Sequence, residues 1–538
     1  MDIKKRRHMQ TALRVTLASL LGSLLLSLGA CGGGGSSAPP APPATDNGAN
    51  SDRAYADPTS YSSAPGAALA GADENAAVIH SQLTLNGKLL AYTATTGHLT
   101  ANDIASGAPK ASFFYIAYTA DSSQDKATRP VTFFYNGGPG AATVWLHLGS
   151  YGPKRIVTNM PANALPSPAP LIDNAESLLD TSDLVFVDAI GSGYSQAIAP
   201  NTNQTFWGVD QDAAAFRDFV ARYVKLNQRD KSPKFLFGES YGGPRSAVLA
   251  NLLESAGIKL SGVVLQSPIL NYNSNCSMFI AAVVSCEGYI PTYAAVGANY
   301  LLTNPVPADL PAYAQQARIF SAATYRPAVT SYIASRTAPS AGLVTQLVNL
   351  TGLSAPLWLS NLDADPGTFQ VALVSGQLIG RYDARVFAPK GSPLASEGDP
   401  SSTVITPAFT SDLVDYLAKQ LKYSANSGYT ISSNAINSWD FSHDSQALPD
   451  TVPDLAAAML QNPALKVLAL HGYHDLATPF YQTELDLARL GNNPNIQIKE
   501  YPGGHMTYLT DDSRRQTKTD LAAFYARAIS AGAASGLN

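Results

Sequence analysis

The sequence has little charge and few cysteines, and it has no apolar run that would cross a bilayer comfortably. Only 14% of its 538 residues are charged and 45% are hydrophobic, a balance that excludes a disordered chain and fits a globular enzyme. The net charge of -5 lacks the basic surplus of a nucleic-acid-binding protein. The length exceeds what one core usually occupies, so we expect a large domain with an insertion, or two domains.

The first thirty residues have the composition of an export signal. A basic segment, Lys4–Arg14, precedes the apolar run Val15–Leu28, which is too short to span a bilayer comfortably. The sequence Leu28-Gly-Ala-Cys31 resembles the lipobox of bacterial lipoproteins, which implies cleavage before Cys31 and lipidation of that residue. The alternative is a plain secretory signal followed by a chance cysteine. We predict a signal peptide over 1–30 and an exported lipoprotein, anchored to a membrane through Cys31 and facing the periplasm or the cell exterior.

The three cysteines bear on the redox compartment. If Cys31 carries lipid, Cys276 and Cys286 remain as an even pair in an oxidising compartment. A local disulfide is then favoured over two free thiols. Neither cysteine has a His or Cys nearby at metal-ligand spacing, so they predict no metal site.

Composition and strand patterns divide the chain into segments. Residues 31–74 are rich in Gly, Ser, Pro and Ala, which predicts a flexible tether. The segment 75–273 begins with a β-hairpin around Asn86-Gly87, and apolar strands separated by helical or loop segments follow. These strands are Val131–Tyr135, Leu184–Val187, Lys234–Phe237 and Leu260–Gln266.

The strand signal fades over residues 274–450. Segments rich in Ala, Leu, Tyr and Gln, such as Pro311–Ser335, predict a helical insertion over the C-terminal edge of the sheet. Strands resume within 451–538, at Leu465–Leu470 and Ile496–Tyr501. We therefore expect an α/β fold with a mixed sheet, in which the insertion separates the two parts of the core.

The stretch Lys234–Pro244 carries the strongest catalytic signal. A short apolar strand runs into Gly238-Glu-Ser-Tyr-Gly242, and helical spacing follows, which is the context of a nucleophile elbow. The two glycines would allow a sharp turn that exposes the hydroxyl of Ser240 at the top of the sheet. The five-residue pattern alone fits an ordinary Gly-rich turn equally well.

A serine nucleophile needs a base and a group that orients the base. Asp475 and His505 each follow a predicted strand, in the chain order Ser, Asp, His, so both are expected at the site-bearing edge of the sheet. Taken singly, Asp475 could only cap the next helix, and His505 could be a surface histidine. His471 and His474 beside Asp475 match no recurrent zinc spacing, so no metal is expected.

Acyl transfer also needs donors for an oxyanion. Tyr241 supplies the backbone N–H that follows the nucleophile. A second N–H is expected from Val131–Gly140, a strand that runs into a Gly-rich loop, and Gly138 is the candidate. As an isolated motif, Gly-Gly-Pro-Gly would favour a plain turn.

Five motifs together resemble the ordered motif set of the serine carboxypeptidases, which are serine exopeptidases of the α/β-hydrolase clan. They are Asn136–Gly140, Val187–Ser195, Gly238–Gly243, Gly472–Asp475 and Gly504–Met506. The segments Arg381–Arg385 and Gly472–Phe480 resemble the exported bacterial branch of that family. The resemblance implies an α/β-hydrolase fold with a mixed, mostly parallel central sheet and a large helical insertion, or lid.

The resemblance also implies the roles of site residues. It makes Ser240, Asp475 and His505 the triad, and the backbones of Gly138 and Tyr241 the oxyanion donors. It further implies that Asn136 and Glu239 hold the free C-terminal carboxylate of a substrate. Because two carboxylates repel, Glu239 would have to be protonated, which favours peptide binding at acidic pH. His505 must stay neutral in the free enzyme to act as the base.

The sequence departs from the family pattern at two places. Ala141-Ala-Thr143 stands where relatives often carry Cys-Ser-Ser, so the disulfide of that cysteine is absent. Ser150 stands where relatives carry a second Glu near the carboxylate site. The network that keeps one carboxyl protonated is therefore expected to be weaker.

We predict an enzyme, a serine-type carboxypeptidase that hydrolyses the C-terminal bond of peptides through an acyl-enzyme and needs no cofactor. Its substrate partner would be a peptide with a free C-terminal carboxylate. One alternative is an esterase or acyltransferase on the same scaffold. Another is a non-catalytic, surface-tethered binding lipoprotein.

Overall fold

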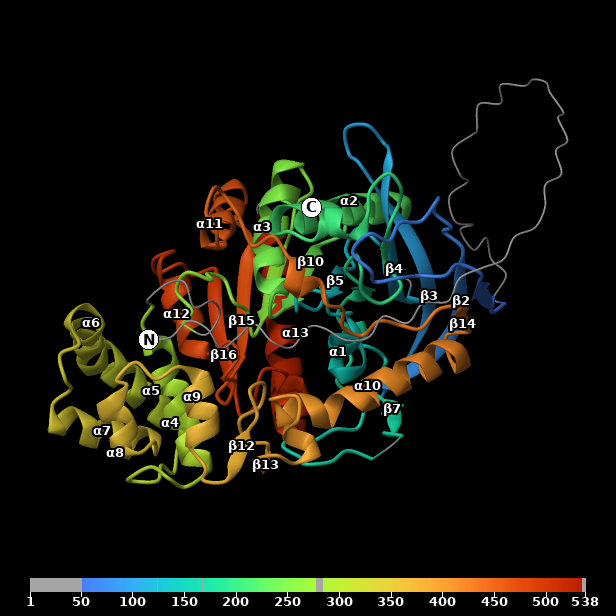
Figure 1. Ribbon diagram of the computed structural model, residues 1–538. Coiled ribbons are helices and arrows are strands. Elements are labelled where there is room, and N and C mark those ends of the chain that lie inside the picture. Colours follow the sequence, from blue (N-terminus) through green and yellow to red (C-terminus); the bar gives the residue numbers. More distant parts are fainter. Residues whose placement is uncertain (1–50, 123, 167, 277–283, 535–538) are drawn as a thin grey trace, which may run out of the picture. The chain divides into compact units, whose positions relative to one another are not determined.

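A computed structural model describes residues 51–122, 124–166, 168–276 and 284–534 (Figure 1). These residues belong to one unit that spans Thr45–Asn538. The predicted signal peptide, Cys31 and the tether up to residue 50 lie outside the described residues. Among the helices that are described, none is both long enough and apolar enough to cross a membrane.

In the described chain, ten strands form the central sheet, and most of them run parallel. The parallel strands follow one another in the order β16 (Ile496–Tyr501), β15 (Lys466–Gly472), β11 (Gly262–Gln266), β10 (Lys234–Glu239), β5 (Val131–Tyr135) and β8 (Asp183–Val187). The antiparallel part consists of β4 (Pro109–Ala120), β3 (Lys88–Asn102), β2 (Ala76–Leu85) and the short β9 (Gln196–Ala197). The turn between β2 and β3 has positive φ at Asn86 (51°) and Gly87 (74°), as a tight hairpin requires.

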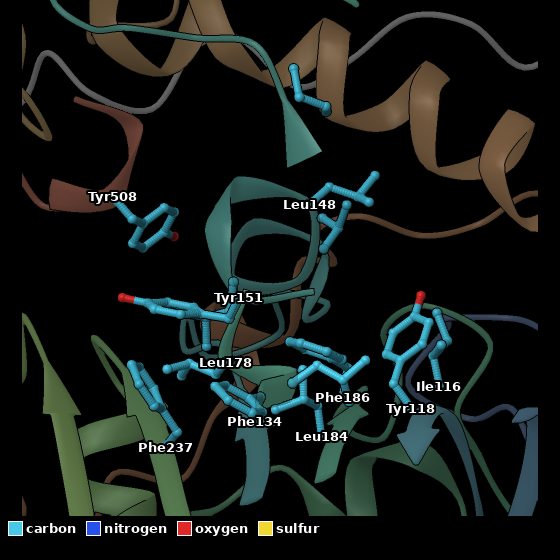
Figure 2. Close-up of a cluster of buried hydrophobic side chains, with 14 of the residues drawn as sticks. Ile116, Tyr118, Phe134, Leu148, Tyr151, Leu178, Leu184, Phe186, Phe237 and Tyr508 are labelled. Carbon is cyan, nitrogen blue, oxygen red and sulfur yellow. The ribbon is translucent and has the colours of Figure 1, made fainter. Parts of the chain in front are cut away.

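Alternate residues of the parallel strands pack into two different cores. Phe133 and Leu236 pack with helices on one face. These helices are α2 (Val209–Leu226), α3 (Gly242–Ser255) and α11 (Val452–Gln461). Phe134 and Phe237 point to the other face, where their rings stack at 4.9 Å between centroids (Figure 2). That face is covered by α13 (Asp511–Ala534) and α10 (Pro400–Lys419).

The insertion after β11 has a helical core of its own. Its helices are α4 (Ile290–Asn299), α5 (Leu310–Phe320), α6 (Arg326–Ser335), α7 (Ala341–Thr351), α8 (Ala355–Ser360) and α9 (Pro366–Ala372). Tyr293 and Phe369 stack at 4.0 Å within that core, and Cys276 and Cys286 form a disulfide bond at its start. Helix α10, which was predicted as part of the insertion, instead packs Phe409 into the core of the main sheet.

The ordered chain begins earlier than the predicted tether of 31–74 allows. Strand β1 (Tyr55–Asp57) pairs with β14 (Tyr423–Ala425). The buried carboxylate of Asp57 accepts hydrogen bonds from the hydroxyls of Tyr61 and Tyr423, each at 2.8 Å. The tether prediction is therefore wrong for residues 51–74. The prediction rested on composition alone, which does not show that aromatic side chains in this segment have partners distant in the chain.

A crossing segment, residues 430–450, lies over the loops that follow β5 and β8. It forms β-bridges from Ser432 to Ala141 and from Thr430 to Gly193. His443 in this segment lies between two aspartates, 2.7 Å from Asp210 of α2 and 2.8 Å from Asp454 of α11. The hydrogen bond to Asp454, and then that to Asp210, raise the pKa of His443 to about 9 against the lowering effect of burial.

Candidate active site

Ser240 lies in a strained turn between β10 and α3. Its φ is 61°, in the left-handed region that non-glycine residues seldom adopt. A Cβ atom on Gly238 would lie 2.2 Å from the carbonyl oxygen of Gly242, and one on Gly242 would lie 3.1 Å from that of Tyr135. Close backbone approach thus excludes a side chain at Gly238 and leaves little room for one at Gly242. The turn has the geometry of a nucleophile elbow.

Asp475 both caps a turn and holds His505. Its Oδ1 accepts the backbone N–H groups of Ala477 (2.8 Å) and Thr478 (3.1 Å). Its Oδ2 accepts the hydroxyl of Thr478 (2.8 Å) and lies 2.7 Å from Nδ1 of His505. The capping role and the catalytic role therefore do not exclude each other, since the cap aims the carboxylate at the imidazole. The sequence predicted capping of Thr478 by Asp475 as an alternative to catalysis, but it gave no signal for the hydrogen bond from the Thr478 hydroxyl to Oδ2.

The imidazole of His505 is buried and held in one orientation. Burial alone would lower the pKa of His505, but the charge and the hydrogen bond of Asp475 outweigh it and raise the pKa above its ordinary value. The backbone N–H of His505 donates to the carbonyl of Tyr382 at 2.6 Å, and the hydroxyl of Ser267 donates to the carbonyl of His505 at 2.6 Å. With Nδ1 donating to Asp475, Nε2 of the neutral ring is left as a proton acceptor.

Ser240 and His505 line the same pocket, at the C-terminal ends of β10 and β16. Its other walls come from the loop after β5, helix α10, the crossing segment and the insertion residue Tyr382, whose ring lies 5.0 Å from that of His505. Within the described chain, the hydroxyl of Ser240 makes no hydrogen bond to His505, as is common for catalytic pairs without a bound substrate. The further lining residues are Asn136, Gly137, Gly138, Ala141, Trp145, Glu239, Ser402, Ile405, Thr406, Ile431, Ser432 and Met506.

The predicted oxyanion donors lie where two loops meet. Gly138 lines the pocket, and Tyr241 directly follows the nucleophile. A Cβ atom on Gly137 would lie 2.4 Å from the backbone nitrogen of Tyr241, so the Gly-rich loop touches the elbow. Neither the Gly138 nor the Tyr241 N–H donates to another group in the described residues. Both N–H groups are therefore available as donors, and their role in binding an oxyanion stays a prediction.

Asn136 and Glu239 form a buried pair in the same pocket. The Nδ2 of Asn136 donates to Oε1 of Glu239 at 2.8 Å, and the hydroxyl of Tyr508 donates to Oε2 at 2.6 Å. Burial raises the pKa of Glu239 to about 7 despite the opposing influence of His505 and these hydrogen bonds. In about half of the protein molecules, Glu239 is therefore protonated near pH 7. Sequence reasoning missed Tyr508, for which proximity to His505 in the chain was the available signal.

The motif Val187–Ser195 contacts the Gly-rich loop that follows β5. The buried Asp188 accepts the backbone N–H of Thr143 at 2.8 Å and the hydroxyl of Tyr429 at 2.7 Å. A Cβ atom on Gly193 would lie 1.7 Å from a carboxylate oxygen of Asp188, so this glycine leaves room for the carboxyl group. The motif thus joins the loop after β5 to the crossing segment.

The two remaining histidines near the site are buried and neutral. Burial lowers the pKa of His471 and of His474 to about 4. In the part of the chain that the structure describes, no group of three or more His, Cys, Asp or Glu side chains could hold a metal ion.

Comparison with known proteins confirms the family resemblance over part of the chain. Residues 86–290 match the model of the serine carboxypeptidase family. Serine carboxypeptidase-like 33 of Arabidopsis thaliana is 30% identical over 162 residues, which are 27% of this chain and 31% of the relative. The pheromone-processing carboxypeptidase KEX1 of Candida dubliniensis is 29% identical over 143 residues, which are 26% of this chain and 19% of the relative. The matches thus span about a third or less of these curated relatives.

A solved structure supports the fold over a longer stretch. The crystal structure of a prohormone-processing carboxypeptidase, KEX1, from Saccharomyces cerevisiae covers 80% of this chain and 91% of its own length, with a TM-score of 0.50 and 13% identity. The predicted α/β-hydrolase fold with its mixed, mostly parallel sheet is confirmed. The narrower resemblance to an exported bacterial branch stays a prediction.

Proposed function

We propose that this chain is a serine-type carboxypeptidase that hydrolyses the C-terminal peptide bond of its substrates through an acyl-enzyme on Ser240. One observation carries the proposal: a buried carboxyl, Glu239, shares the pocket of Ser240 and His505 and is paired with Asn136. General acyl transfer requires no such group beside the nucleophile. A protonated carboxyl next to an amide is a suitable receptor for the free carboxylate at the end of a peptide.

In the first half of the reaction, Oγ of Ser240 attacks the carbonyl carbon of the C-terminal peptide bond. Nε2 of His505 takes the hydroxyl proton, and Asp475 stabilises the imidazolium through Nδ1–H. The carbonyl oxygen becomes an oxyanion that accepts the N–H groups of Gly138 and Tyr241. Each such donor contributes about 3–4 kcal/mol to transition-state stabilisation. The imidazolium then protonates the leaving amine, and the C-terminal residue departs.

In the second half, water attacks the ester on Ser240. His505 accepts a proton from this water and returns it to Oγ as the acyl group leaves. The oxyanion donors act again on the same oxygen. The shortened peptide is released with a new C-terminal carboxylate.

The carboxyl of Glu239 distinguishes a free peptide end from a blocked one. As an acid, Glu239 donates its O–H to the carboxylate of the substrate, and Asn136 can donate beside it. When Glu239 is ionised, it repels the same carboxylate inside a buried site. Peptide hydrolysis is therefore expected to weaken as the pH rises through about 7, the pKa of Glu239. Hydrolysis of an uncharged ester should not show this loss.

We also infer export and membrane anchoring from the N-terminal sequence. The basic segment, the short apolar run and Cys31 support a lipoprotein that faces the periplasm or the cell exterior. Metabolic labelling of a bacterial host with a fatty-acid analogue should label the wild-type chain and not Cys31→Ser. Equal labelling of both chains would contradict lipidation at Cys31.

Mass spectrometry of a mixed peptide library tests the activity. The wild-type enzyme should release residues singly from the C-terminal end and spare the same peptides with amidated C-termini. A fluorophosphonate probe should label the wild-type chain and not Ser240→Ala, which serves as the matched inactive control. Hydrolysis of esters without release of residues from peptides would favour an esterase or acyltransferase. Equal cleavage of free and amidated peptides would contradict recognition of the free C-terminal carboxylate. Absence of labelling in the wild type would favour a binding protein.

A further inference from the structure

Each oxygen of Glu239 is held by a different neutral donor. Oε1 accepts the amide of Asn136, and Oε2 accepts the phenol of Tyr508 at 2.6 Å. The side chain of Tyr508 is fully buried, and Glu239 is almost fully buried. The phenol is therefore a fixed partner of this carboxyl.

The local fold creates the space for this phenol. Tyr508 lies in the short helix η8 (Thr507–Leu509), and its ring centroid is 5.5 Å from that of Tyr151. Figure 2 shows the two side chains next to each other. A Cβ atom on Gly149 would lie 2.4 Å from the ring of Tyr508. The π-helix η1 (His147–Tyr151), which contains Gly149 and Ser150, can approach the ring only because position 149 is glycine.

The phenol of Tyr508 gives Glu239 a hydrogen-bond partner, although Ser150 predicted a weaker network around this carboxyl. Ser150 stands at the position expected to carry a second carboxyl, and its backbone carbonyl accepts the side-chain amide of Asn174. Glu239 instead receives the hydroxyl of Tyr508. A second carboxyl could share a proton with Glu239 and repel its charge, whereas a phenol donates a hydrogen bond and stays neutral.

We propose that Tyr508 is a positioning residue that orients Glu239 toward the substrate carboxylate and sets the upper pH limit of peptide hydrolysis. This inference rests on the proposed carboxypeptidase function and deepens it. The hydroxyl donates to Oε2, which favours the charged form of Glu239. It also fixes the plane of the carboxyl group, so that the acidic O–H is presented to the pocket and not to the protein interior.

Few other groups can shift the titration of Glu239. The titratable groups that face it are Tyr508, Tyr151, Tyr382, His505 and Asp475. Burial, followed by the charge of Glu239, raises the pKa of Tyr508 well above its ordinary value, so its phenol is neutral throughout the working range. Replacement by phenylalanine therefore removes one hydrogen bond and changes no charge.

The test compares Tyr508→Phe with the wild type and with Tyr151→Phe. Tyr151 is equally buried and touches the ring of Tyr508, but its hydroxyl lies 3.5 Å from Gln266 and not at Glu239. For each enzyme, kcat/KM is measured from pH 4 to 10 with a free-ended peptide and with a small uncharged ester. The alkaline limb of the peptide profile should move up by about one to two pH units in Tyr508→Phe, the effect of a lost hydrogen bond to a charged group.

Other readouts separate positioning from a purely structural role. In Tyr508→Phe at pH 5, KM should rise for the free-ended peptide and stay unchanged for the ester. Tyr151→Phe should leave the alkaline limb in place. Site-specific replacement of Tyr508 by a fluorinated tyrosine keeps the shape and makes the O–H a stronger donor, so the limb should move to lower pH. This replacement tests the inference even if Tyr508→Phe does not fold.

The outcomes distinguish this inference from the proposed function. If the wild type removes C-terminal residues but neither substitution of Tyr508 moves the limb, the role of Tyr508 is refuted and the carboxypeptidase assignment stands. If Tyr151→Phe moves the limb as far as Tyr508→Phe, the effect is one of packing and the inference is also refuted. If the wild type shows no preference for free-ended peptides, the proposed function itself fails.

Discussion

Replacing Glu239 by glutamine makes the protonated state of this side chain permanent. The amide has nearly the same shape as the carboxylic acid, and it keeps a donor for the substrate carboxylate. It cannot ionise, so it cannot repel that carboxylate. We expect Glu239→Gln to retain hydrolysis of free-ended peptides and to change its dependence on pH.

The size of the change follows from the burial of Glu239. Burial raises the pKa of Glu239 from about 4.5 to about 7, so at pH 8 only about a tenth of the free enzyme carries the acid form. Both substrates share the titration of His505, so the effect of Glu239 is read from the ratio of kcat/KM on the peptide to that on the ester. Between pH 6 and 8 this ratio should fall roughly tenfold in the wild type and stay constant in the variant. Because the charge of Glu239 helps to raise the pKa of His505, the acid limb of the variant should also move to lower pH.

The same ionisation predicts a change in stability. Glu239 holds its proton in the folded state after the unfolded chain has lost it, so the folded state loses stability as the pH rises from about 4.5 to about 7. The loss amounts to about 3 kcal/mol, because the pKa of Glu239 is about 7 in the folded state and about 4.5 in the unfolded chain. Urea unfolding at several pH values should show this decline in the wild type and a smaller one in Glu239→Gln.

The assay measures kcat/KM against pH for a free-ended peptide and an uncharged ester, with both enzymes. The change in the pKa of His505 affects both substrates, whereas binding of the C-terminal carboxylate by Glu239 affects only the peptide. The ester therefore measures the His505 effect by itself. An alkaline limb of the same size on both substrates would place its origin outside Glu239. If Glu239→Gln kept the wild-type peptide profile, the reasoning on the protonated carboxyl would be refuted.

Three further predictions follow from the site and its supports. Asp475→Asn should reduce kcat on the order of 10³–10⁴-fold, because the amide favours the wrong tautomer of His505, and it should leave KM nearly unchanged; an effect under tenfold would contradict this. Gly238→Ala should destabilise the fold by at least about 2 kcal/mol, as its Cβ would lie 2.2 Å from a backbone oxygen, whereas Gly342→Ala, with open space around its Cβ, should be neutral or stabilising in thermal unfolding. The contacts of His443 with its two aspartates stabilise the fold fully below about pH 6.5, and this stabilisation is lost as the pH rises through about 9, the pKa of His443. The loss is less than about 3 kcal/mol, because solvent screens Asp210, which is more than half exposed. Thermal unfolding of His443→Gln should therefore lack the wild-type decline between pH 7 and 10, and equal declines would refute this role.

Local sequence patterns predicted where the buried strands lie in the chain and which residues form the candidate triad. The strands near Val131, Lys234 and Gly262 follow from short apolar runs, since strands buried on both faces leave that signature. The elbow around Ser240 is local as well, because its glycines and its turn lie within five residues. Asp475 was identified in the same way, from its place after a strand.

Only the tertiary structure decided which distant side chains meet. The contact between Tyr508 and Glu239 joins residues 269 positions apart, and no local period encodes it. The ordering of Asp57 by Tyr423, 366 positions away, likewise overturned a tether prediction based on composition. Such pairs form because the folded core brings loops together that are distant in the chain. The sequence therefore predicted the candidate triad, whereas packing decided the contacts that surround Glu239.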